Sequence, residues 1–172
     1  MKTGTRTQLS AMMFLEFFVW GAWYVPMGVY LGAIKFPGTA IGSAYSTTAL
    51  AAILSPFFIG MIADRFFSAE RVLGIMHILG GIVLLGVSRI TEPGLFFWVL
   101  LVYALTYMPT LALVNAVAFH QMEDVEKQFP SIRVFGTLGW IVAGLLIGFL
   151  EVNSGGARWN FDHPFGLPMS AA

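Results

Sequence analysis

Long apolar runs, separated by short polar or Gly/Pro-containing breaks, fill most of this 172-residue chain. A helix needs about 20 apolar residues to cross the hydrocarbon core of a bilayer, and each run is close to that length or longer. The runs lack the alternation of polar and apolar residues that is typical of transmembrane barrel strands. The pattern therefore predicts an all-α, polytopic bundle of transmembrane helices over residues 9–34, 40–63, 72–90, 94–121 and 132–150.

The composition agrees with a membrane protein. Hydrophobic residues make up 58% of the chain and charged residues only 10%, whereas an ordinary soluble domain carries about 25% charged residues. The net charge is zero, so nothing indicates binding to nucleic acid. The absence of cysteine excludes disulfides, thiol catalysis and thiolate metal sites. The three histidines are too scattered for a metal motif, and we expect no metal or cofactor.

The basic residues predict the orientation of the chain. The first apolar run is longer than a signal-peptide core of about 7–15 residues, so we interpret it as a retained helix. With the N-terminus inside, the cytoplasmic side receives Lys2, Arg6, Arg65, Arg71, Lys127 and Arg133. The outside receives Lys35, Arg89 and Arg158. This bias predicts a cytoplasmic N-terminus in a cell (inner) membrane.

The tail 151–172 is polar and rich in glycine and proline. After five crossings it would lie outside the cell. We expect it to be an extracytoplasmic loop that leads to a missing sixth helix, in a truncated gene or a fragment.

The first run contains a carboxyl group, Glu16, about one-third of the way along its length. Ionisable groups in a membrane span are costly and usually functional. Helical periodicity puts Glu16 on one stripe with Trp20, Trp23, Met27 and Tyr30. A carboxyl among aromatic rings is a candidate proton carrier. The alternative is that Glu16 only bonds a neighbouring helix and the tryptophans form an interfacial belt. Pro26 predicts a kink in this helix.

A second polar stripe opens the fifth run. We expect Pro130 to begin that helix, which puts Arg133, Thr137 and Trp140 on one face at i, i+4 and i+7. The guanidinium and hydroxyl groups suit the oxygens of a polar solute, and the indole can stack on the plane of its ring. The alternative is that Arg133 reaches the cytoplasmic headgroups while Trp140 faces lipid.

A third constellation, Gly60, Asp64 and Arg65, starts at the end of the second run and continues toward the third. Gly60 and Asp64 are one helical turn apart, so another helix could approach beside the carboxylate. Asp64 at a helix C-terminus opposes the helix dipole unless a cation compensates it. The arrangement fits a contact made in one conformational state and broken in another. An ordinary solvated charge pair is the alternative.

Several motifs in this order resemble a known family. G-x-x-A-D-R (Gly60 to Arg65) is similar to the loop signature of the major facilitator superfamily. F-P-x-I-R-x-x-G-T-x-G-W (Phe129 to Trp140) resembles the opening of helix five in its nucleoside:proton symporter family. Three further segments resemble the same family: L-x-F-x-x-W-G-x-W from Leu15 to Trp23, the pair Tyr45-Ser46, and Tyr107 to Thr110 with Asn115. The resemblance spans nearly all of residues 9–150.

That resemblance implies a twelve-helix fold of two halves, of which this chain would supply helices one to five. It implies proton-coupled nucleoside uptake by alternating access, with solute bound between the halves. The nucleoside-binding positions correspond to Arg133, Thr137 and Trp140, and we add Trp20, Trp23 and Asn115 as candidates. Glu16 is the proton-coupling candidate, although the family's best-known members are expected to carry a neutral Gln there. The usual aromatic at the position of Trp140 is Phe.

Other functions remain open alternatives. A sister family of oligosaccharide:proton symporters carries a similar R-x-x-G-x-x-G-W pattern. A non-transporting membrane assembly subunit would also contain several spans, but it would not need the Arg133 stripe. An enzyme is disfavoured, because the chain contains no G-x-S-x-G or H-E-x-x-H motif and no close acidic pair within an apolar run.

Overall fold

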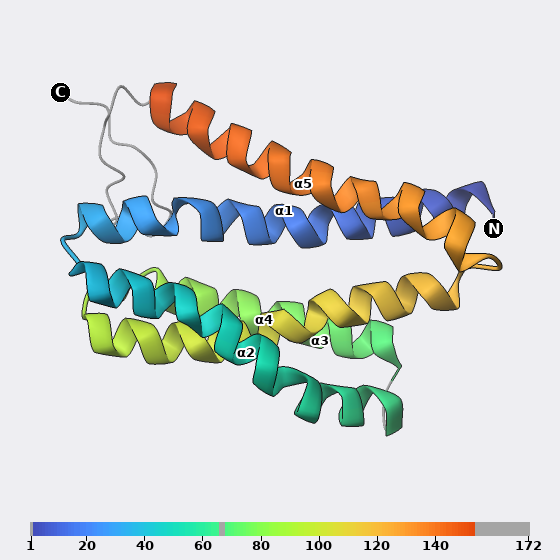
Figure 1. Ribbon diagram of the computed structural model, residues 1–172, viewed down its shortest axis with the longest axis horizontal. Helices are drawn as coiled ribbons and strands as arrows, with labels where there is room; N and C mark the ends of the chain where they lie inside the picture. Colours follow the sequence, from blue (N-terminus) through green and yellow to red (C-terminus); the bar gives the residue numbers. More distant parts are fainter. Residues whose placement is uncertain (1, 66–67, 154–172) are drawn as a thin grey trace.

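The computed structural model describes residues 2–65 and 68–153, and for residues 56–65 and 151–153 it describes the backbone alone. The described chain is a bundle of long helices (Figure 1). They are α1 (Thr3–Ala33), α2 (Gly38–Arg65), α3 (Ala69–Val87), α4 (Pro93–His120) and α5 (Val125–Asn153). The predicted all-α class is therefore confirmed. The predicted outer loop lies mostly in residues 154–172, outside the described part.

Within the described residues, four helices are long and apolar enough to cross a membrane: α1, α3, α4 and α5 as far as Leu150. Their outer surfaces are apolar, as shown by Ile78 at 67% exposure and Leu145 at 69%. Such faces suit lipid, because backbone groups are satisfied within each helix and the side chains meet hydrocarbon. The chain is therefore a multi-pass membrane protein. The predicted span 40–63 falls on α2, and the side chains of residues 56–65 of this helix lie outside the described part of the chain.

The start of α5 differs from the prediction. The helix begins at Val125, and Pro130 lies inside it rather than at its first turn. Asp124 explains the earlier start, since its carboxylate accepts a hydrogen bond from the Lys127 N–H at 3.2 Å and its carbonyl accepts one from the Gln128 N–H at 3.0 Å. This N-cap lies in a polar segment before the apolar run, where hydrophobic periodicity gives no signal.

The helices associate as two groups (Figure 1). α1 packs along α5, while α4 packs against both α2 and α3, and few backbone contacts join the groups. Small residues allow α1 and α5 to approach closely. A Cβ atom at Gly21 would lie 3.0 Å from the Ala143 Cβ, and one at Gly139 would lie 3.1 Å from the Phe18 nitrogen. Packing through glycine is a common route to close association in membranes.

Two apolar clusters fill the interior between the groups. One contains Met27 and Leu31 of α1 with the first half of α4, and the other contains Met13 of α1 with Val114 near the end of α4. Glu16 lies between Met13 and Met27 along α1, and it is 3% exposed. A buried polar layer therefore separates the two clusters in the middle of the bundle.

α1 remains a single helix through Pro26, and a side chain from α2 contacts its backbone on both sides of this residue. The Tyr45 hydroxyl accepts a hydrogen bond from the Gly28 N–H at 2.9 Å and donates to the Tyr24 carbonyl at 3.3 Å. Gly28 and Tyr24 are the donor and acceptor of one i to i−4 step, so the hydroxyl is inserted into the helix ladder. Such insertions are a known cause of helix bending.

Glu92 begins α4, with Pro93 at the first helical position. Its carboxylate accepts hydrogen bonds from the N–H groups of Gly94, at 2.8 Å, and Leu95. These two hydrogen bonds lower the pKa of Glu92 below its ordinary value of 4.5. The charged form is therefore favoured by the folded helix, as expected for a carboxylate at a helix N-terminus.

This cap predicts a specific pH dependence of stability. Because the folded-state pKa is lowered, the contribution of Glu92 is fully present above pH 4.5 and is lost as the pH falls through the lower folded value. The Glu92→Gln variant removes the titration. We expect the melting temperatures of the wild type and of E92Q to differ at neutral pH and to converge in acid. A gap that stays constant from pH 7 to pH 3 would contradict the assignment.

Candidate functional site

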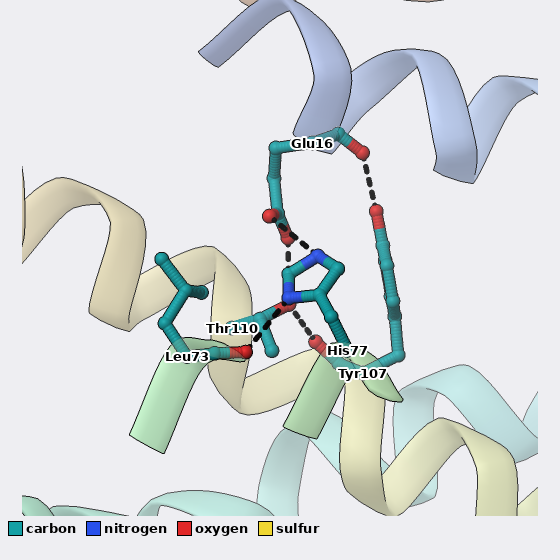
Figure 2. Close-up of polar contacts among 5 residues, drawn as sticks. All are labelled: Glu16, Leu73, His77, Tyr107 and Thr110. Atoms are coloured by element: carbon teal, nitrogen blue, oxygen red, sulfur yellow. Dashed lines mark hydrogen bonds and ion pairs between the residues drawn. The ribbon is translucent and has the colours of Figure 1, made fainter. Parts of the chain in front are cut away.

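Glu16 is the centre of a polar network between three helices (Figure 2). Its Oε2 lies 3.1 Å from Nε2 of His77 on α3. Its Oε1 accepts a hydrogen bond from the Thr110 hydroxyl on α4 at 2.6 Å. The buried carboxyl therefore has a partner for each oxygen, which lowers the cost of keeping it away from water.

The neighbouring backbone belongs to the same network. The Tyr107 hydroxyl donates to the backbone carbonyl of Glu16 (Figure 2). The Thr110 hydroxyl also lies 2.6 Å from the Tyr107 carbonyl, which it can use as a second acceptor. The Tyr107 ring faces His77 with a centroid separation of 6.0 Å. Side chains of α4 thus hold the position of Glu16 and of its partner.

An aromatic wall joins α1 to α5. The rings of Trp20 and Trp140 meet edge to face with centroids 5.1 Å apart. Tyr24 contacts both, at 5.9 Å from Trp20 and 6.2 Å from Trp140. Tyr45 of α2 continues the row, 5.0 Å from Tyr24. Edge-to-face pairs leave ring faces available, so the wall can accept a flat solute by stacking.

Arg133 lies next to this wall. Its guanidinium carbon is 4.1 Å from the centroid of the Phe17 ring, and Phe17 in turn contacts Trp20 at 6.0 Å. No carboxylate pairs with Arg133 among the described residues. A half-buried arginine held by a cation–π contact keeps its hydrogen-bond donors free for a ligand.

The other predicted binding residues lie in different parts of the bundle. Thr137 is exposed on the Arg133 face of α5. Trp23 turns toward α4, where its ring meets that of Tyr103 at 5.1 Å. Within the described chain, the Trp20 Nε1 and Asn115 Oδ1 atoms are buried and lack hydrogen-bond partners. The structure therefore brings Trp20, Trp140 and Arg133 together, while Trp23 and Asn115 belong to the α4 side.

The loop prediction has no structural test here, because the side chains of Gly60, Asp64 and Arg65 lie outside the described residues. Among the described residues, no group of three or more His, Cys, Asp or Glu side chains could hold a metal ion.

His77, the partner of Glu16, was not predicted from the sequence. It was considered only as a possible metal ligand, and its distance along the chain from Glu16 hid the pairing. A usable signal was present: a histidine in the middle of an apolar run is costly for the same reason as Glu16. Two such groups in separate spans are natural partners.

The protein is similar to several transport proteins. A family model described as "Nucleoside H+ symporter" matches residues 1–159. YegT of Escherichia coli K12 is 50% identical over 146 residues, which cover 85% of this chain and 34% of YegT. The xanthosine permease of the same organism is 39% identical over 150 residues, covering 84% of this chain and 36% of the permease.

The fold is similar to that of a solved transporter. A crystal structure of a mutant of the nucleoside transporter NupG matches with a TM-score of 0.80 and 33% identity, over 94% of this chain and 40% of that one. The chain spans about a third of the length of the curated relatives that it matches. These relatives are transporters and permeases rather than enzymes. Between the two symporter families considered from the sequence, the comparisons favour one, and the chain belongs to the nucleoside H⁺ symporter family.

Proposed function

We propose that this chain acts in proton-coupled uptake of nucleosides by alternating access, supplying the helices that correspond to the N-terminal part of its relatives. The observation that carries the proposal is the contact of Trp20 with Trp140 in the aromatic wall, with Arg133 next to it, in a chain that belongs to the nucleoside H⁺ symporter family. A second half, like that of the relatives, would close the site from the opposite side.

The chemistry of the wall suits a nucleoside. A flat base can stack on the indole of Trp140, while the free donors of Arg133 bond oxygens of the base or the ribose. Thr137, on the same face of α5, adds a hydroxyl group that can donate and accept. The buried Trp20 Nε1, which has no hydrogen-bond partner among the described residues, supplies one further donor. Ring stacking and hydrogen bonding from one helix pair would fix the orientation of the solute.

Glu16 is the candidate proton carrier within this scheme. Proton and nucleoside bind from outside, the two halves rock, and both are released to the cytoplasm. The proposed setting is the cell inner membrane with a cytoplasmic N-terminus, as the basic residues indicate. The loop motif of Gly60, Asp64 and Arg65 would stabilise the outward-facing state through contacts on the cytoplasmic side.

Uptake of labelled uridine tests this function directly. Cells expressing the complete reading frame that contains this chain are compared with cells carrying the empty vector, with and without a protonophore. We expect uptake above the vector level that collapses with the proton gradient. Uptake of a labelled disaccharide instead of uridine would overturn the nucleoside assignment. Uridine uptake insensitive to the protonophore would overturn proton coupling.

A further inference from the structure

The contact between Glu16 and His77 has a geometry that restricts where protons can lie. The Nδ1 atom of His77 is 2.9 Å from the Leu73 carbonyl oxygen, one turn earlier on α3 (Figure 2). A carbonyl oxygen only accepts hydrogen bonds, so Nδ1 must carry a proton. The Nε2 atom that faces Glu16 is then an acceptor in neutral histidine and a donor in the imidazolium form.

This restriction leaves two matched arrangements for the pair. In one, Glu16 is protonated on Oε2 and donates to the Nε2 lone pair. In the other, the same proton is on Nε2, and an imidazolium donates to the carboxylate. Both arrangements carry zero net charge, and transfer of the proton along the 3.1 Å contact converts one into the other. Removing the proton leaves a carboxylate facing a lone pair, so the hydrogen bond is lost.

Among the described residues, the groups around the pair provide no other neutralising charge. From α4, the groups that face Glu16 are Thr110 and the phenols of Tyr107 and Tyr103. From α5, Arg133 lies over Phe17, the residue next to Glu16, and makes no ion pair with it. Among the described residues, the partner of Glu16 that can carry positive charge at this contact is therefore His77.

The pair also connects two helices that are otherwise separate. The backbones of α1 and α3 make no close contact in the described chain, since each packs against other helices. The side chains of Glu16 and His77 bridge this gap beside Thr110. His77 is the more accessible end, because its side chain is 33% exposed and that of Glu16 is 2% exposed. A link of this kind depends on whether its proton is present.

We propose that Glu16 and His77 together form a binding site for one transported proton, which enters through His77 and ties α1 to α3 while it is held. This inference rests on the proposed function and deepens it, because it assigns the proton to a pair of residues in the first half of the transporter. Release of the proton breaks the α1–α3 link, which couples proton movement to helix movement.

Two transport measurements, uridine counterflow and proton-driven uridine accumulation, distinguish a proton-binding role of the pair from a structural role. The Glu16→Gln side chain keeps the shape and can donate an amide N–H to Nε2, but it cannot release that proton. A pH difference of about one unit drives roughly tenfold accumulation when one proton accompanies each nucleoside. In vesicles we expect E16Q and H77Q to lose this accumulation while keeping uridine counterflow within about tenfold of the wild type. The H120Q variant, at the exposed end of α4, should accumulate normally.

Accumulation by E16Q equal to that of the wild type would overturn the site. Loss of counterflow and accumulation together, in folded variants, would also overturn it, because counterflow needs no proton release and its loss indicates a structural role for the pair. If the wild type transports no uridine, the proposed function fails and the pair is still decided by ¹⁵N NMR of a protein with His77 as its single histidine. We expect a protonated Nδ1, and an Nε2 resonance that shifts in E16Q. An unshifted Nε2 resonance would overturn the shared proton.

Discussion

Replacing Arg133 with alanine in the complete reading frame is expected to weaken nucleoside binding strongly. The side chain is half-buried and contacts the Phe17 ring, and no described carboxylate neutralises it. Its free donors are therefore the strongest hydrogen-bonding groups on the aromatic wall. Removing a charged partner from a buried hydrogen-bonded contact costs about 2–5 kcal/mol. The dissociation constant should rise roughly 30-fold to a few thousand-fold.

Two further variants make this experiment specific. The Arg133→Lys variant keeps the charge but loses the planar fork of donors, so its affinity should lie between those of the wild type and R133A. The Arg71→Ala variant removes an exposed arginine at the start of α3 and should bind normally. Calorimetric titration of the purified protein with uridine measures all four proteins. An unchanged dissociation constant for R133A would remove Arg133 from the site.

Replacing Gly139 with alanine is expected to disrupt the α1–α5 pair. A Cβ atom at this position would overlap the Phe14 carbonyl oxygen and lie 3.0 Å from the Phe14 carbonyl carbon. These are backbone atoms of α1, so they can move only if the helix moves. Overpacking of this kind costs about 1–3 kcal/mol. The aromatic wall depends on the same helix pair, so G139A should weaken nucleoside binding as well as stability.

The matched control is on the same helix. A Cβ atom at Gly144 would meet nothing within 4 Å. The Gly144→Ala variant should therefore be neutral or slightly stabilising, since alanine favours helix over glycine by about 0.5–1 kcal/mol. Melting temperatures of the three purified proteins measure the effect. Equal melting temperatures for G139A and G144A would show that the close approach at Gly139 does not limit the stability of the α1–α5 pair.

The helical segments were predictable because their signal is local. Each run is long enough to span a bilayer. The apolar side chains on the outside of a helix are compatible with lipid regardless of which helices pack beside it. The boundaries were less accurate where polar caps extend a helix. The Asp124 cap places the start of α5 at Val125, several residues before the apolar run begins.

The candidate site was predictable within one helix and not between helices. Periodicity placed Arg133, Thr137 and Trp140 on one face of α5, and it identified Glu16 and Trp20 on α1. It did not indicate that Trp20 meets Trp140, or that Glu16 turns away from that wall toward α3 and α4. The single stripe predicted on α1 therefore serves two neighbouring environments.

The sequence by itself determined which segments form membrane helices and which polar groups must be accommodated within them, because length, hydropathy and helical periodicity act along one chain segment. Only the tertiary structure decided the partners. Glu16 meets His77 because α4 holds both beside Thr110, and α1 meets α5 because glycines allow their backbones to touch. The residues on a helix face show which polar groups need a partner. Close packing of the whole bundle decides which neighbouring helix provides that partner.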